Sequence, residues 1–202
     1  MAFRGCLGVS LLFSIVTVQA ASIEEVDKLQ VEDYECPAKV SVNTSEICEC
    51  NSFYEINCLH LEFLPTFVEN NLKFNGFYAK DQKIPQLDAN RFQHLHVRKI
   101  SLDFNPLGDS ISADAFDYNR DDLEELSLGG CGIGSLPLGL LDDMRNLHFL
   151  HLWSNRIKVI PNGFFRETPN IRELNLWDNQ INHLYDEMFA GLGNLQKLDL
   201  DN

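Results

Sequence analysis

The sequence predicts an α/β-type solenoid, a horseshoe with short parallel strands on its concave face and irregular or short helical segments on its convex return path. Three observations predict this fold. Apolar residues recur in a single register, the register repeats about every 24 residues, and each repeat opens with a segment in which apolar and polar residues alternate. Such a chain has no single globular core, because each repeat packs only on its neighbours.

The register L-x-x-L-x-L-x-x-N-x-L-x-x-L begins six times. Successive starts are separated by 23, 26, 24, 24 and 24 residues. The starting residues are Phe74, Val97, Leu123, Leu147, Ile171 and Leu195. The longest spacing follows Val97, where the return path carries extra residues and is expected to bulge. Chance agreement over six copies is negligible, so this register defines the organisation of the chain.

Each defined position of the register has a physical role. In the L-x-L segment the leucines point into the solenoid and the residues between them face outward, as in a strand. The Asn at the ninth position, for example Asn155 or Asn179, can bond backbone groups that the following turn leaves unpaired. Cys131 stands at this position in the third repeat. We expect Cys131 to be a buried free thiol, with a reactive or intermolecular cysteine as the alternative.

Four further cysteines lie within 23 residues, as Cys36, Cys48, Cys50 and Cys58. They predict two disulfides, because an exported chain meets an oxidising compartment. A zinc site is the alternative, but two ligands as close in sequence as Cys48 and Cys50 fit tetrahedral coordination poorly. The same segment carries Asn43-Thr44-Ser45, which predicts a glycosylated and exposed Asn43.

The repeat resembles the typical class of extracellular leucine-rich repeats, over about residues 36 to 202. The cysteine spacing C-x11-C-x-C-x7-C, followed by Leu61, Leu64 and Pro65, is similar to the amino-terminal cap of secreted members. This resemblance implies pairing of Cys36 with Cys50 and of Cys48 with Cys58, whereas sequence alone allows three connectivities. The general run of the first repeats also resembles the non-catalytic repeat subunit of luciferin monooxygenases.

The predicted organisation has four parts. Residues 1–20 read as a secretory signal peptide cleaved near Ala20, with one positive charge, a short apolar run and small residues at its end. Residues 21–35 form an amino-terminal tail, residues 36–65 the cysteine-rich cap and residues 66–202 the repeats. The sixth repeat stops at Asn202 before its turn, so we expect an incomplete product or a fragment of a longer protein, with a naturally truncated or partner-capped form as the alternative.

Composition and motifs argue against several functions. A formal net charge of −14 repels nucleic acid and anionic lipid, and no second apolar run predicts a membrane span. The run Gly129-Gly130-Cys131-Gly132 lacks the lysine and spacing of a phosphate loop. The histidines and acidic pairs fall at unrelated places in the register, which predicts no metal, no cofactor and no enzyme activity.

Function is therefore expected on the strand face, where this fold displays the outward residues of successive strands. Three columns of outward residues result. The third position gives Gly76, Lys99, Glu125, Phe149, Glu173 and Lys197. The fifth gives Tyr78, Ser101, Ser127, His151, Asn175 and Asp199. The seventh gives Lys80, Asp103, Gly129, Trp153, Trp177 and Asp201.

Both tryptophans of the chain are neighbours in one column, close enough for their indoles to pack. With the aromatic and polar residues beside them, they have the composition of a binding hot spot. The candidate partner-binding residues are Phe149, His151, Trp153, Glu173, Asn175 and Trp177. The predicted function is a secreted, extracellular module that binds a protein or glycan. The alternative is a non-catalytic subunit of a secreted enzyme complex, such as a luciferin monooxygenase.

Overall fold

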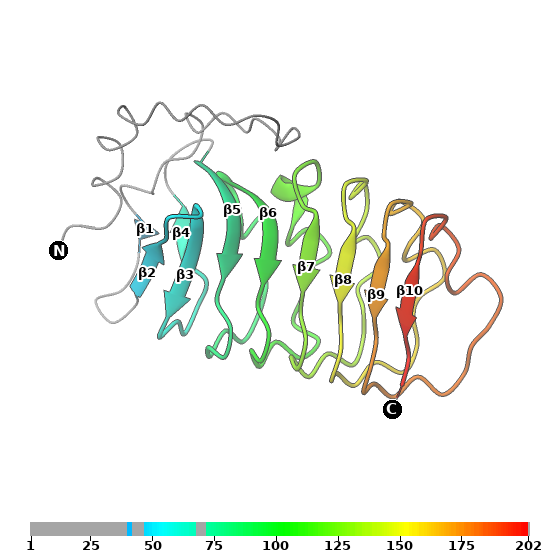
Figure 1. The fold of residues 1–202 in the computed structure, drawn as a ribbon. Coiled ribbons are helices and arrows are strands. Elements are labelled where there is room, and N and C mark those ends of the chain that lie inside the picture. The colour runs from blue at the N-terminus through cyan, green and yellow to red at the C-terminus, as the bar shows by residue number, and fades with distance from the viewer. Residues whose placement is uncertain (1–39, 42–46, 68–71, 202) are drawn as a thin grey trace, which may run out of the picture.

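A computed structural model describes residues 40–41, 47–67 and 72–201. The predicted signal peptide with Ala20, the tail, Cys36 and the Asn43 sequon lie outside the described residues. Within the described chain the predicted solenoid is confirmed: the strands stack side by side into one curved sheet, and the return path runs behind them (Figure 1).

The main sheet has eight strands in the order β10-β9-β8-β7-β6-β5-β3-β2. Neighbours from β3 to β10 are parallel, whereas β2 runs antiparallel to β3 at the amino-terminal end. The strands of this sheet are β2 (Ile47–Cys50), β3 (Glu55–Leu59), β5 (Leu72–Tyr78), β6 (Leu95–Ser101), β7 (Glu125–Ser127), β8 (Phe149–His151), β9 (Glu173–Asn175) and β10 (Lys197–Asp199). A separate antiparallel pair joins β1 (Val40–Ser41) and β4 (Thr66–Phe67).

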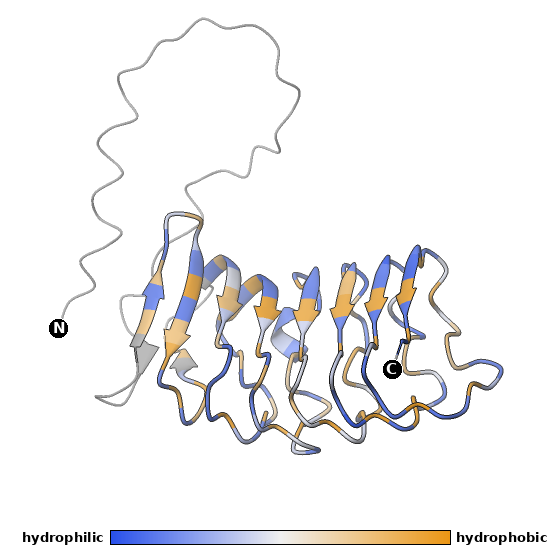
Figure 2. Cartoon of the chain, turned by 60° about the horizontal axis from the view of Figure 1, so that its bottom comes forward, coloured by the Kyte–Doolittle hydropathy of each residue, from blue (hydrophilic) through white to orange (hydrophobic). Residues whose placement is uncertain are grey.

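The leucines of each strand point inward, as the alternating pattern predicts. Leu126, Leu150 and Leu174 pair with one another across β7, β8 and β9 and are each at most 1% exposed. Figure 2 shows the resulting alternation, with apolar residues at the same level of successive strands. Burial of these matched side chains holds each repeat on the next, since a repeat alone has no partner for its apolar side.

Phenylalanines fill the convex side of the core. Phe92, Phe116 and Phe165 are fully buried, and Phe92 stacks on Phe116 with ring centroids 5.5 Å apart. Phe165 likewise stacks on Phe189 at 6.3 Å. The return path around these rings consists mainly of turns, and its helical content in the described chain is the 3-10 helix η2 (Asp117–Asn119).

The amino-terminal cap is a hairpin of β2 and β3 in which Cys48 lies directly opposite Cys58. These two cysteines form a disulfide, which confirms the disulfide prediction for this pair. The partner implied for Cys50 is Cys36, which lies outside the described residues, so that pairing stays a prediction. The hairpin covers the first parallel strand, which would otherwise present open backbone groups.

The last repeat is less buried than the others. Leu198 on β10 is 39% exposed and Leu184 on the preceding return path is 56% exposed. A hollow in this part of the chain is lined by Leu176, Asn179, Ile181, Leu184 and Leu200.

Candidate binding surface

The concave face has the register that the sequence predicts. Phe149 pairs with Glu173 and His151 with Asn175, and the same alignment runs from Gly76 to Lys197 and from Tyr78 to Asp199. The seventh position continues the alignment beyond the strands, because the Ser154 amide donates to the Trp177 carbonyl at 2.8 Å. The three predicted columns therefore exist as continuous rows across the face.

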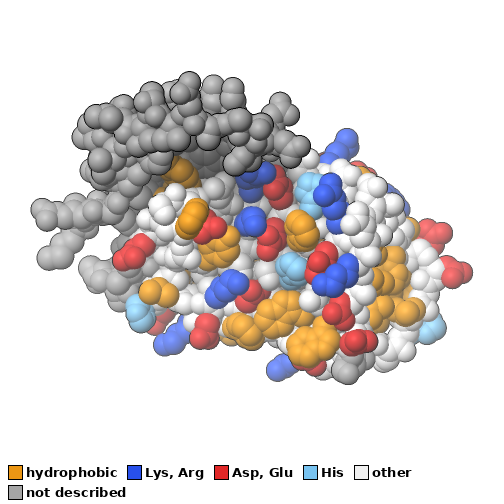
Figure 3. Space-filling model, viewed as in Figure 1, with side chains coloured by type: hydrophobic (Ala, Val, Ile, Leu, Met, Phe, Trp, Pro, Cys, Tyr) orange, Lys and Arg blue, Asp and Glu red, His pale blue; other side chains and the backbone are white. Residues whose placement is uncertain are grey.

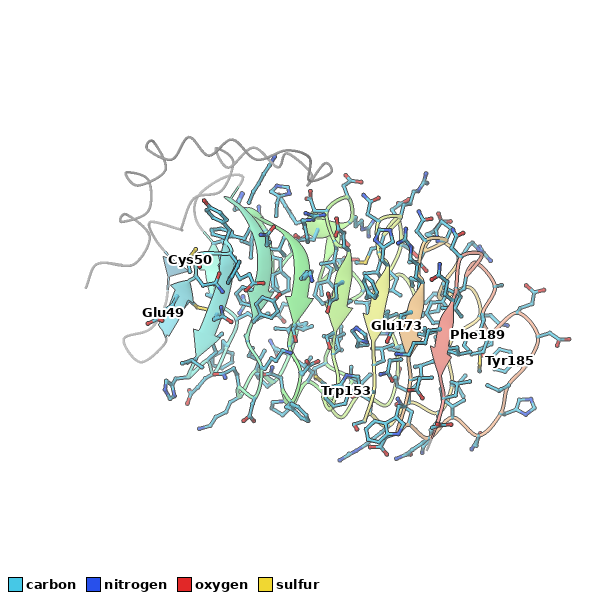
Figure 4. The ribbon with its side chains drawn as sticks, viewed as in Figure 1. Glu49, Cys50, Trp153, Glu173, Tyr185 and Phe189 are labelled. Atoms are coloured by element: carbon cyan, nitrogen blue, oxygen red, sulfur yellow. A yellow bond between two sulfur atoms is a disulfide. The ribbon has the colours of Figure 1, made fainter. Side chains whose placement is uncertain are left out.

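The six candidate residues lie together on β8, β9 and the turns that follow them. Phe149 is 39% exposed and Trp177 is 45% exposed, whereas Trp153 is half-buried. His151, Glu173 and Asn175 are also half-buried. Figure 4 places Trp153 at the end of its strand and Glu173 in the middle of the face.

The two indoles do not pack on each other, contrary to the expectation from their shared column. Within the described chain, Trp153 instead meets Phe104 edge to face, with ring centroids 5.1 Å apart. The indole lies across Gly129, where a Cβ atom would overlap its ring. The absence of a side chain at Gly129 thus leaves the space into which Trp153 turns, away from Trp177.

Phe104 is a residue of this surface that sequence reasoning missed. It follows β6 at the eighth position of its repeat, is 54% exposed, and has a positive φ of 61°. Its ring rests over Gly130, where an added Cβ would come within 2.6 Å of a ring carbon. The Gly129-Gly130 pair was the sequence signal for Phe104. These two positions have no side chains, and the rings of Trp153 and Phe104 occupy the space above them.

Ion pairs link neighbouring strands across the face. Lys99 reaches Glu125 at 3.1 Å, and Lys197 reaches Glu173 at 2.7 Å. Hydrogen bonding and charge from Glu173 raise the pKa of Lys197 above its usual value. Phe149 stands between these two pairs in the same row. The lysine charges in this row are therefore balanced, and an apolar ring separates the pairs.

A buried carboxylate organises the amino-terminal half of the face. Asp103 is 3% exposed and accepts hydrogen bonds from the hydroxyls of Ser101 and Ser127 and from the Gly129 amide, at 2.9, 2.5 and 2.8 Å. Lys80 pairs with the same carboxylate at 3.2 Å. A buried charge needs such partners to offset its lost hydration. This network also fixes the backbone at Gly129, on which Trp153 rests.

The asparagines of the ninth position form the predicted ladder under this surface. Asn155 accepts from the amides of Cys131 and Ile133 at 3.0 Å, and donates to the carbonyls of Leu128 and Leu152 at 2.9 Å. Asn105 and Asn179 make equivalent contacts in their repeats.

Cys131 occupies the same place in the third repeat, as a buried free thiol, which confirms the prediction. Its thiol donates to the Leu102 carbonyl at 3.2 Å, much as an asparagine amide does at this position. Burial raises the pKa of Cys131 to about 12, so the thiolate is scarce at neutral pH. This cysteine serves the core of the repeat.

Tyr78 borders the face next to the cap. Its hydroxyl donates to the Glu55 carboxylate at 3.2 Å. Burial, together with the negative charge of Glu55, raises the pKa of Tyr78 to about 12. The phenol is therefore neutral at physiological pH and acts as a hydrogen-bond donor between β3 and β5.

Two features of the described residues bear on other functions. Over residues 47–67 and 72–201 no three His, Cys, Asp or Glu side chains converge as metal ligands would. In the same part of the chain no helix has the length and apolar character needed to cross a bilayer.

Comparisons with known proteins agree with the geometry. Residues 145–202 match the family model described as leucine rich repeat. No curated protein matches. Among solved structures, the crystal structure of a TLR13–ssRNA13 complex is similar with a TM-score of 0.56 and 29% identity, over 65% of this chain and 18% of that one. Human 5T4, a trophoblast glycoprotein called Wnt-activated inhibitory factor 1, aligns with a TM-score of 0.44 and 18% identity, over 83% of this chain and 81% of its own.

The chain thus spans less than a fifth of the TLR13 chain, and the shared part is the repeat scaffold. The matched residues 145–202 contain the parallel pair β8 and β9, the inward Leu150 and Leu174, and the asparagine bonds of two repeats. Residues 145–202 therefore match leucine-rich repeats, and the described chain has the fold of a leucine-rich-repeat solenoid.

Proposed function

We propose that this protein is a secreted module that binds a protein partner through its concave face, centred on Phe149, Trp153 and Trp177, and that it does not catalyse a reaction. The Cys48–Cys58 disulfide and the predicted signal peptide support an extracellular location. The leucine-rich-repeat fold supports a binding role, since repeat scaffolds present extended concave surfaces.

The observation that carries this proposal is the aromatic exposure beside β8 and β9. Phe149 in the third-position row and Trp177 in the seventh-position row expose 39% and 45% of their surface. Exposed aromatic side chains bordered by polar groups are typical of the centre of an interface, where tryptophan contributes most to affinity. Glu173, Asn175 and His151 supply such a polar border.

A protein partner is favoured over RNA, although the TLR13 structure is described as a complex with ssRNA13. Binding of RNA depends on lysines and arginines that neutralise phosphates. On the described concave face Lys80, Lys99 and Lys197 are each paired with a carboxylate. The net charge of −14 adds to the repulsion.

Site-specific photo-crosslinking tests the proposal. A benzoylphenylalanine introduced at His151 on the full chain should crosslink to an extracellular protein, and the same group at the exposed Val159 on the return path should not. The double substitution Trp153→Ala/Trp177→Ala should then weaken binding of that protein by at least about 2 kcal/mol. Equal labelling from both positions, or unchanged affinity in the folded double variant, would refute the concave site.

The identity of the crosslinked molecule separates the remaining alternatives. A tightly bound secreted enzyme would support the reading as a non-catalytic subunit, in which case this face is a subunit interface. A glycan or RNA that competes for crosslinking at His151 would replace the protein partner in the proposal.

A further inference from the structure

The strand ends of the concave face carry a row of aromatic rings, which we call the aromatic edge: Phe104, Trp153 and Trp177. Each residue lies just after a strand, and Gly129 and Gly130 lie between the first two. Figure 3 shows apolar side chains gathered along the edge of this face where the strands end, and Figure 4 labels Trp153 there. Trp177 and Phe104 are 45% and 54% exposed.

The Phe104 end of the aromatic edge is held in a conformation that most side chains avoid. All five described residues at this eighth position have positive φ, and they are Asp81, Phe104, Gly130, Ser154 and Asp178. Asp and Gly tolerate this conformation, whereas a bulky residue in it costs about 1 to 3 kcal/mol. The ring of Phe104 is fixed nonetheless, because it rests over Gly130 and against Trp153. An exposed ring maintained at such a cost indicates a function in binding.

Three acidic residues lie near the Trp177 end of the aromatic edge. Asp178 follows it directly, Asp201 occupies the same row just after the next strand, and Asp199 pairs with Asn175 in the strand register. In the described chain none of these three carboxylates forms an ion pair, although Asp178 accepts a hydrogen bond from Ser154. The lysines of the face are already neutralised by other acids, as described above. The local charge beside Trp177 is therefore negative.

We infer that the aromatic edge binds a basic segment of a protein partner, with an arginine or lysine head group over Trp177. An indole face attracts a cation by up to about 2 kcal/mol when the pair is shielded from water. The three carboxylates add to this attraction and would repel an acidic partner. Phe104 and Trp153 then offer a rigid apolar wall for a neighbouring side chain of the same segment. This inference rests on the proposed function for the choice of face, and adds the chemistry of the partner.

The charge beside Trp177 can be measured without any partner. Trp153→Phe leaves Trp177 as the sole tryptophan, because the chain has two. Its fluorescence should be quenched more strongly by caesium ions than by iodide after correction for their efficiencies on free tryptophan amide. Asp178→Asn/Asp201→Asn should reduce this preference. The matched control Asp114→Asn/Asp142→Asn also removes two exposed acids, on the return path, and should leave it unchanged. No preference for caesium, or equal loss in both double variants, would overturn the inference.

Binding is then tested with an N-acetylated hexa-arginine peptide as the probe, against hexa-glutamate. The single-tryptophan variant should report binding of hexa-arginine through its emission, and Trp177→Leu in the full chain should lower the calorimetric affinity about tenfold. Asp178→Asn/Asp201→Asn should lower the affinity for hexa-arginine by a comparable factor. The control Asp114→Asn/Asp142→Asn should lower this affinity by less than about twofold.

Equal loss of affinity in the control would mean diffuse attraction to an acidic protein and would overturn the inference. A partner that crosslinks at His151 but binds Asp178→Asn/Asp201→Asn as well as the unmodified chain would also overturn it, while leaving the proposed function intact. Circular dichroism of each variant checks that the fold is unchanged.

Discussion

Replacing Asn155 by alanine should destabilise the solenoid more than replacing any exposed asparagine. The side chain is 6% exposed and satisfies two amides and two carbonyls, those of Cys131, Ile133, Leu128 and Leu152. Alanine leaves the amides of Cys131 and Ile133 and the Leu128 carbonyl buried without a partner, whereas the Leu152 carbonyl keeps its bond from the Asn179 amide. Each unpartnered group costs about 1 to 3 kcal/mol, so a loss of about 3 kcal/mol is expected even at the lower bound. That is a large share of the roughly 5 to 15 kcal/mol available to a folded domain.

Urea unfolding followed by circular dichroism measures this loss. Asn170→Ala is the matched control, since the Asn170 side chain lies at an exposed site, where it donates to the Arg145 carbonyl at 2.8 Å and accepts from the Asn194 amide at 3.0 Å. It should cost less than about 1 kcal/mol, because water can replace the lost bond. If Asn155→Ala costs no more than Asn170→Ala, the ladder does not hold the turns together and the reasoning fails.

Three further predictions concern single groups. Cys131 should react with iodoacetamide at pH 8 at least about 100-fold more slowly than a free cysteine, because burial suppresses its thiolate. Unfolding in urea should restore the reaction rate. Rapid labelling of the native protein would contradict the burial of this thiol. The pKa of Tyr78 is raised from 10.0 to about 12, so its contribution to stability should be fully present below pH 10 and lost as pH rises toward 12. Absorbance at 295 nm should show a late-ionising phenol that disappears in Tyr78→Phe. Cys48→Ser/Cys58→Ser should lower the free energy of unfolding by about 3 kcal/mol, given a sequence separation of 10 between the two cysteines. An unchanged urea midpoint would show that the hairpin does not need this disulfide.

The backbone arrangement could be predicted because two simple periods fix it. Alternation decides which residues of a strand face inward, and the repeat spacing decides which residues of successive strands align. Phe149 therefore lies beside Glu173, and His151 beside Asn175, as the sequence indicated. The longer spacing after Val97 did not disturb this alignment, since the extra residues are accommodated on the return path, where Leu87 still bridges Ile111.

The direction of the surface side chains could not be predicted in the same way. Trp153 turns toward Phe104 because Gly129 leaves room on that side, and a column of outward residues does not contain this information. The pairing of Lys197 with Glu173 likewise depends on the rotamer of a long flexible chain.

A second asparagine row, directly before each of the last three repeat starts, was also missed. Asn146, Asn170 and Asn194 each donate to a carbonyl of the preceding repeat. Their even spacing of 24 residues was the available signal.

The asparagine ladder has a consequence for synthesis, because its bonds point one way along the chain. Asn155 completes the turn that contains Ile133, and Asn179 completes the turn that contains Ile157, so each turn is closed by a residue made about one repeat later. At a translation rate of roughly 5 to 20 residues per second, every turn waits on the order of seconds for its closing amide. Folding on the ribosome should therefore follow translation with a constant lag, and the growing end always exposes one unfinished turn to chaperones or to other nascent chains.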